Sequence, residues 1–429
     1  MIFKTNKYKS HLVKLKESKF SKDTIWLIGS QAILLVSGFL MNVLIGQKLG
    51  AKDLGVFNQI LGYYMILSSI FSLGLNNSII KKIAANDNLE LDKKILSSNI
   101  FLSIIFSTLF TLTFIILSLT FPKIFSSIEL SKTIIIPFIS MPFYNLNKNF
   151  MAYYSGKRKQ KEFSIFRSLR WIIIITYSLI CLILNKGLTE ILFAFLISEI
   201  TLTIISFFHL RKLFTKKFNR FDLVENFTFG FKSFSAELFA VLNDKFDILL
   251  IGYFLTNSEV GIYSFFIFFA KSLYIFPGIL QQNINPIISR FWEEKNKLIE
   301  LQEKLNKLKR INFIALITQT CLLVLFYQLV ISFVKEEFNN SMYLLLISIF
   351  GIFPSALISW SGSMLIMTGK LKENITRTFL IMIISITSTF ILSYSYGLIG
   401  ATIAVCINSI ISFIIMNTFV SKLLGLKLI

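Results

Sequence analysis

The sequence contains two versions of one twelve-residue segment, GQKLGAKDLGVF at residues 46–57 and GYFLTNSEVGIY at residues 252–263. At a constant offset of 206 residues they share two glycines, a leucine, an acidic residue, an aliphatic pair and a terminal aromatic residue. We expect the second glycine of each, Gly55 and Gly261, to allow a sharp backbone turn where a helix begins. The recurrence predicts a chain built from two related halves.

Further matches follow at similar offsets. GKRK at residues 156–159 corresponds to GKLK at residues 369–372, and Pro142 corresponds to Pro354. Chance similarity between apolar segments is the alternative explanation, and the non-apolar identities of the first match argue against it.

The segments around these repeats are strongly apolar. Hydrophobic residues make up 54% of the 429 residues and charged residues 16%, against about 25% charged in soluble domains. An apolar run of roughly 20 residues crosses the hydrocarbon core as a helix. The sequence therefore predicts an all-α polytopic membrane protein with about twelve spans, at residues 24–47, 55–80, 95–120, 132–155, 163–185, 188–210, 231–255, 260–284, 311–334, 341–368, 374–396 and 398–421.

Charge between the spans is strongly asymmetric. The two tails, the connections on their side and the span ends next to them contain 35 Lys and Arg residues, and the opposite connections with their adjacent span ends contain 6. By the positive-inside rule both termini are cytoplasmic. The net charge of +21 is therefore explained by topology and by attraction to lipid headgroups, and a nucleic-acid partner is not expected.

Six spans per half give both halves the same orientation, as in transporters with parallel repeats. We expect two six-helix bundles related by a parallel pseudo-two-fold axis. The predicted divisions are a basic cytoplasmic tail at 1–23, an N-terminal bundle at 24–212, a cytoplasmic linker at 213–230, a C-terminal bundle at 231–421 and a cytoplasmic tail at 422–429.

Three stretches carry a resemblance to a known family: LGAKDLGVF at 49–57, FDILLIGYFL at 246–255 with VGIYS at 260–264, and GLIGA at 397–401. They resemble the polysaccharide flippases of the multidrug/oligosaccharidyl-lipid/polysaccharide (MOP) exporter superfamily, which include the O-antigen (Wzx-type) flippases. Twelve spans fit the O-unit branch, whereas the peptidoglycan-precursor flippases typically have fourteen.

The resemblance implies a central cavity that faces each side of the membrane in turn. It also implies transport of undecaprenyl-pyrophosphate-linked repeat units, of the O-antigen or capsule type, from the cytoplasmic to the periplasmic leaflet of the bacterial inner membrane. A polysaccharide polymerase and its chain-length machinery would be partners of such a transporter.

Charged residues inside the spans are the first site candidates, since each should face a partner or water. Four of them, Glu237, Asp244, Lys245 and Asp247, lie within one face of the span at 231–255. The seven intramembrane charges are Lys148, Glu199, Glu237, Asp244, Lys245, Asp247 and Lys271.

Two interpretations of these charges remain open. In the first, Lys245 and Lys271 form ion pairs with the nearby acids and fix neighbouring helices together. In the second, Lys148, Lys245 and Lys271 bind a pyrophosphate in a hydrated cavity. Glu199, Glu237, Asp244 and Asp247 are then candidates for coupling to a proton or sodium ion, since burial and a nearby lysine shift a carboxyl pKa in opposite directions.

Lys232 and Arg290 flank the predicted spans at 231–255 and 260–284 at their inner ends, and they could be the first residues to bind the lipid pyrophosphate. Simple anchoring of the spans in the membrane is the alternative. The sequence shows no nucleotide-binding loop or metal-ligand cluster, so we expect no cofactor, no metal and no enzymatic activity. A multidrug cation antiporter of the same superfamily is the main alternative. A membrane glycosyltransferase or polymerase is a further alternative, which the short outer connections disfavour.

Overall fold

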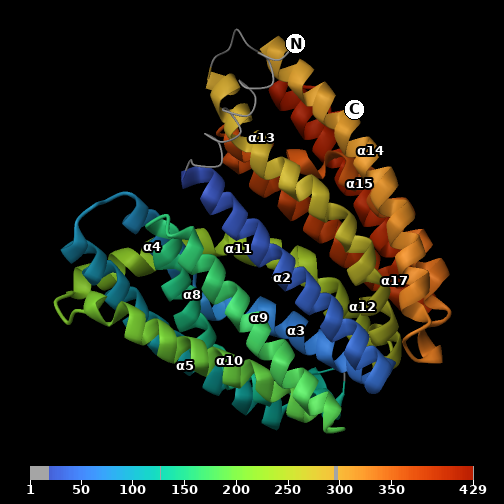
Figure 1. The fold of residues 1–429 in the computed structure, drawn as a ribbon, viewed down its shortest axis with the longest axis horizontal. Helices are drawn as coiled ribbons and strands as arrows, with labels where there is room; N and C mark the ends of the chain where they lie inside the picture. Colours follow the sequence, from blue (N-terminus) through green and yellow to red (C-terminus); the bar gives the residue numbers. More distant parts are fainter. Residues whose placement is uncertain (1–18, 126, 294–297, 429) are drawn as a thin grey trace, which may run out of the picture. The chain divides into compact units, whose positions relative to one another are not determined.

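The computed structural model describes residues 19–125, 127–293 and 298–428, and every regular element in these ranges is helical. Figure 1 shows the arrangement of the helices. The first half contains α2 (Lys19–Lys48), α3 (Ala51–Ser72), α4 (Leu75–Ala84), α5 (Leu89–Thr120), α6 (Ile128–Thr133), α7 (Ile135–Phe138), α8 (Met141–Gly156), α9 (Gln160–Ile183) and α10 (Leu188–Leu210). The second half contains α11 (Arg220–Phe254), α12 (Asn257–Lys271), α13 (Ile275–Glu293), α14 (Leu298–Ile331), α15 (Ser341–Ile358), α16 (Met364–Met367) and α17 (Leu371–Leu424).

The expected spans are present, although several are interrupted. The span at 55–80 is divided into α3 and α4, because Leu73 and Gly74 have positive φ angles of 46° and 68°. The span at 132–155 is divided into α6, α7 and α8, in the segment that contains Pro137 and Pro142. The last two spans form α17, which is broken at Gly397 with φ 59° and ψ −137°.

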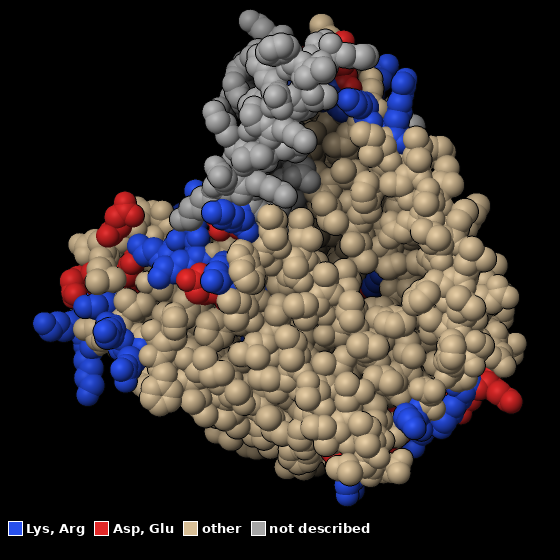
Figure 2. Space-filling model, viewed as in Figure 1, with Lys and Arg blue, Asp and Glu red and all other residues tan. Residues whose placement is uncertain are grey.

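Nine helical stretches in the described ranges are long and apolar enough to cross a membrane. The stretch at Leu371–Leu424 corresponds to two predicted spans. Two further predicted spans fall short, because α8 has only 16 residues and the membrane part of α11 carries five charged residues. On the face shown in Figure 2, uncharged side chains cover continuous areas and charged residues gather in a few groups. The predicted class, an all-helical polytopic membrane protein, is confirmed.

The chain packs into two compact units. The first contains the described residues up to Met41 together with Leu67–Glu237, and the second contains Asn42–Ile66 together with Leu238 onwards. This division differs from the predicted linker at 213–230, since α11 begins at Arg220 and continues without a break past Glu237. Part of the expected linker is therefore helical.

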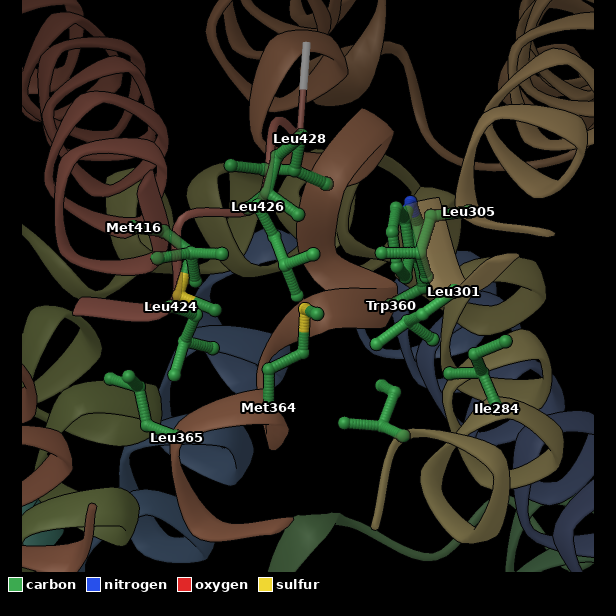
Figure 3. Packing of buried hydrophobic residues seen from close by; sticks show 13 residues of the cluster. Ile284, Leu301, Leu305, Trp360, Met364, Leu365, Met416, Leu424, Leu426 and Leu428 are labelled. Atoms are coloured by element: carbon green, nitrogen blue, oxygen red, sulfur yellow. The ribbon is translucent and has the colours of Figure 1, made fainter. Parts of the chain in front are cut away.

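Each unit has its own apolar core. In the first unit, residues of α4, α5, α8, α9 and α10 form a cluster that includes Ile79, Leu96 and Tyr154. In the second unit, α13, α14, α15, α16 and α17 contribute a cluster in which Trp360 is fully buried. Figure 3 shows this second cluster, with Met416 and Leu424 on one side and Ile284 and Leu305 on the other.

Within the second unit, the two copies of the repeated segment contact each other. A Cβ atom on Gly55 would lie 1.8 Å from the carbonyl oxygen of Asn257, and one on Gly261 would lie 1.9 Å from that of Ala51. The two glycines therefore let α3 and α12 cross in backbone contact. The predicted role in a sharp turn is wrong, because both glycines lie inside helices and neither has a positive φ.

Candidate functional site

In the first unit, Lys148 is presented by α8, which packs against α4, α5 and α10 (Figure 1). Its ammonium forms an ion pair with Glu237 and lies 3.3 Å from the Ser72 hydroxyl. Asn77 donates a hydrogen bond of 3.1 Å to the second oxygen of Glu237. Both charged side chains are about one-fifth exposed, so this pair is partly open to solvent or to a bound group.

The second pair of this unit is almost completely enclosed. The Glu199 side chain is 1% exposed, and Arg170 Nε lies 2.7 Å from its Oε1 atom. The second carboxylate oxygen accepts hydrogen bonds from Arg170 Nη2 at 3.2 Å and Asn147 at 2.8 Å. The guanidinium also lies over the ring of Tyr144, at 4.7 Å. A carboxylate held in this way favours a structural role for Glu199.

In the second unit, Lys271 of α12 joins two acids of α11. Its ammonium lies 3.4 Å from Asp244 and 3.5 Å from Asp247, and it donates a hydrogen bond of 3.0 Å to the Asp244 carbonyl oxygen. Lys245 lies 3.1 Å from the other oxygen of Asp244, and the Tyr263 hydroxyl donates to Asp247 at 2.8 Å. We call these two acids and two lysines the α11–α12 charge cluster.

The α11–α12 charge cluster borders a cavity of about 330 Å³ inside the second unit. Asp244, Asp247 and Lys271 line it together with residues of α15 and α17. The rest of the polar wall is formed mainly by hydroxyl and amide side chains, contributed by Asn243, Ser355, Ser359, Ser385, Thr389, Asn408, Ser409 and Ser412. Such a wall can bind a hydrated or hydroxyl-rich group through many neutral hydrogen bonds.

The remaining predicted site residues are not brought into these clusters. Lys232 is exposed near the middle of α11. Arg290 belongs to α13, and its side chain lies outside the described part of the chain. The sequence analysis did not single out Tyr263 and Arg377 as site residues, although Tyr263 contacts Asp247 and Arg377 lines the cavity.

The sequence profile of the family described as "Polysaccharide biosynthesis protein" matches residues 20–292 of this chain. The chain belongs to this family. Its profile covers the first unit, α11, α12 and almost all of α13. A comparison with curated proteins finds no match.

Solved structures show the fold of this polysaccharide biosynthesis protein. An inward-facing multidrug resistance MATE family transporter of the MOP superfamily is similar with a TM-score of 0.72 and 15% identity, over 91% of this chain and 95% of that one. The lipid II flippase MurJ in an inward closed conformation is similar with a TM-score of 0.73 and 17% identity, over 93% of this chain and 87% of that one. A MOP superfamily transporter from Pyrococcus furiosus is similar with a TM-score of 0.58 and 14% identity, over 95% of each chain.

Family and fold together confirm the resemblance found in the sequence. The chain is a multi-pass membrane protein with the fold of the MOP superfamily transporters and flippases.

Proposed function

We propose that this polysaccharide biosynthesis protein is a flippase for undecaprenyl-pyrophosphate-linked oligosaccharide repeat units of the O-antigen or capsule type. It moves them by alternating access from the cytoplasmic to the periplasmic leaflet of the bacterial inner membrane, with both its termini in the cytoplasm. The family assignment and the MOP fold support a role in exporting polysaccharide building blocks. A polymerase and its chain-length machinery would receive the translocated unit.

The observation that carries this proposal is the charge balance of the interior. All four carboxylates that the sequence places inside spans have a lysine or arginine within 3.5 Å. A transporter for cationic drugs would be expected to keep an acidic group available for its cargo, since an opposite charge binds a cation most strongly. The lysine-neutralised interior and the hydroxyl-lined cavity instead suit an anionic, sugar-bearing cargo.

The glycosyltransferase or polymerase alternative is disfavoured by the connection between α14 and α15. This connection contains one short 3₁₀ helix, Glu336–Phe338. Lys335 donates to the Leu49 carbonyl oxygen at 3.1 Å, and Glu337 accepts from the Ala51 amide at 2.8 Å. The connection therefore packs against the end of α2 and the start of α3, and it contains no separate catalytic domain.

Within the proposed mechanism, Lys148 in the first unit, and Lys245 and Lys271 in the second, are each candidate ligands of the pyrophosphate. Lys232 and Arg290 are the candidates for attracting it at the cytoplasmic side. Lys271 has a second role, because a pyrophosphate that draws its ammonium away leaves Asp244 and Asp247 with less positive charge nearby. These carboxylates then take up a proton or sodium ion, which couples ion movement to cargo movement. Glu237 serves in the same way beside Lys148, and the enclosed Glu199 is the weakest candidate for ion coupling.

Complementation tests the proposal. The gene is expressed in a bacterium that lacks its own O-unit flippase, and surface polysaccharide is scored together with membrane abundance of the protein. Because flippases can prefer one sugar unit, the assay is repeated in a host that makes the native unit. Restored surface polymer in either host supports lipid-linked glycan transport. Normal membrane abundance without surface polymer in both hosts contradicts it.

A further inference from the structure

Arg377 lies in the second turn of α17 and lines the cavity of the second unit. Its Nη2 atom donates to Asn374 at 3.1 Å, and its Nη1 atom donates to the sulfur of Met416 at 2.9 Å. Its Nε atom is buried and has no hydrogen-bond partner. A thioether is a weak acceptor, so two of the three guanidinium nitrogens are poorly satisfied by the protein.

Arg377 also lacks a counter-charge. No carboxylate within the described ranges forms an ion pair with it. The α11–α12 charge cluster cannot serve as one, because its two aspartates are already balanced by Lys245 and Lys271. Arg377 therefore carries an uncompensated positive charge on the cavity wall. Arg377 is half-buried, and a guanidinium that is partly withdrawn from water is normally paired, since leaving a charge unpaired away from water is unfavourable.

The cavity around Arg377 has the size and lining of a ligand site. Its volume of about 330 Å³ is at the lower end of the roughly 300–1,000 Å³ found for small-molecule sites. Ser359, Ser409 and Ser412 line it together with the guanidinium. One part of its wall is apolar, because Met416 and Ile358 belong to the buried cluster of Figure 3. The cavity thus combines a cation, several hydroxyls and an apolar wall.

We infer that this cavity is an oxyanion site in which Arg377 binds a carboxylate or phosphate group of the transported glycolipid. A guanidinium presents its N–H donors in a planar fork that matches two oxygens of such a group. The serine hydroxyls complete the hydrogen bonds of the oxyanion or of an attached sugar ring. The group comes either from an acidic sugar in the repeat unit or from the lipid pyrophosphate, and this identification of the source rests on the proposed function.

Binding to the purified full-length protein tests the inference without any transport step. Calorimetry is performed with glucuronate, inorganic pyrophosphate and, as a neutral control, glucose. The variants are Arg377→Gln, Arg377→Lys and a matched control, Arg211→Gln, which alters an exposed arginine in the 3₁₀ helix Arg211–Leu213. Thermal unfolding without ligand confirms that each variant is folded.

We expect at least one anion to bind the unaltered protein and Arg211→Gln with equal affinity. Affinity should fall at least tenfold in Arg377→Gln and several-fold in Arg377→Lys, which keeps the charge but loses the fork. Binding of glucuronate alone identifies an acidic sugar as the source, binding of pyrophosphate alone identifies the lipid, and binding of both supports the shared oxyanion chemistry.

Absence of binding by both anions overturns the inference, as does binding that both Arg377 variants leave unchanged. If Arg377→Gln does not fold, the decision rests on Arg377→Lys together with Ser412→Ala. Unchanged affinity in these two variants overturns the inference equally. A failure of complementation with normal anion binding would instead count against the proposed function alone.

Discussion

Replacing Lys271 with methionine removes the ammonium that joins Asp244 and Asp247. The two acids are left in different situations. Asp244 is 54% exposed and keeps Lys245 at 3.1 Å. Removing its contact with Lys271 should therefore lower stability only as much as removing an exposed ion pair does, by about 0–1 kcal/mol. Asp247 is 11% exposed and, among the residues that the structure describes, keeps the neutral donors Tyr263 hydroxyl and Ile248 amide. Removing one partner of a buried pair costs about 3–5 kcal/mol.

We expect Lys271→Met to reduce the stability of the second unit by about 2–3 kcal/mol, somewhat below the buried-pair range. The reduction is smaller because the 3.5 Å separation is long and the Tyr263 hydrogen bond of 2.8 Å persists. The control Lys245→Met removes a more exposed contact and should lose at most about 1 kcal/mol. The double variant Lys271→Met/Asp247→Asn should recover most of the loss, since asparagine is neutral and still accepts from Tyr263.

The assay compares thermal unfolding of the purified variants in one detergent. Transport by complementation is scored per folded molecule. Lys271→Met and the double variant should both transport poorly, because both lack the proposed pyrophosphate ligand, although only the first should be markedly destabilised. The reasoning is refuted if Lys271→Met is no less stable than Lys245→Met, or if adding Asp247→Asn lowers stability further.

Three other perturbations are informative. Gly261→Ala places a methyl group against a backbone carbonyl of α3 and should lower the free energy of unfolding by about 1–3 kcal/mol. The control Gly278→Ala has no atom within 4 Å of the added carbon and should leave the stability of the protein unchanged. Equal melting temperatures of the two variants in thermal unfolding would contradict the close crossing of α3 and α12. The exchange variant Lys148→Glu/Glu237→Lys keeps the ion pair but moves the cation to α11. If Lys148 binds cargo, this variant should transport much less than the unaltered protein does. Transport at the level of the unaltered protein would show that the pair is purely structural. Glu199→Ala leaves the nearly enclosed guanidinium of Arg170 unpaired and should lower the free energy of unfolding by roughly 3–5 kcal/mol. Transport should fall only in proportion to the amount of folded protein. A folded but inactive variant would instead support a role of Glu199 in ion coupling.

The sequence predicts the helices well because hydropathy and length are properties of the local chain. Gly397 marks the break between the last two spans, and the structure places non-helical backbone there. The break at Leu73 and Gly74 was missed, because the surrounding run is apolar throughout and one glycine in a helical pattern is a weak signal.

The ion-pair partners of charged side chains are harder to predict from the sequence than the helices are. The pairing of Lys245 and Lys271 with the acids of α11, one of the two interpretations left open, is present in the structure. The partner of Lys148 could not be identified, because Glu237 lies 89 residues away and a helical wheel shows a face without showing what packs on it. Arg377 lies at the inner end of a predicted span, where a basic residue is indistinguishable from a topology anchor.

The pairing pattern on α11 bears on the proposed cycle. Glu237 is neutralised by Lys148 within the first unit, and Asp244 and Asp247 are neutralised by Lys245 and Lys271 within the second. A charge left unpaired near the bilayer centre costs at least roughly 2.5–3.5 kcal/mol. If these acids were paired with lysines of the other unit, any movement between the two units would break the pairs and incur that cost. Because each of these pairs lies within one unit, the proposed alternating access would leave all of them intact. Arg377, for which the described residues provide no carboxylate partner, then stays available for the proposed anionic cargo.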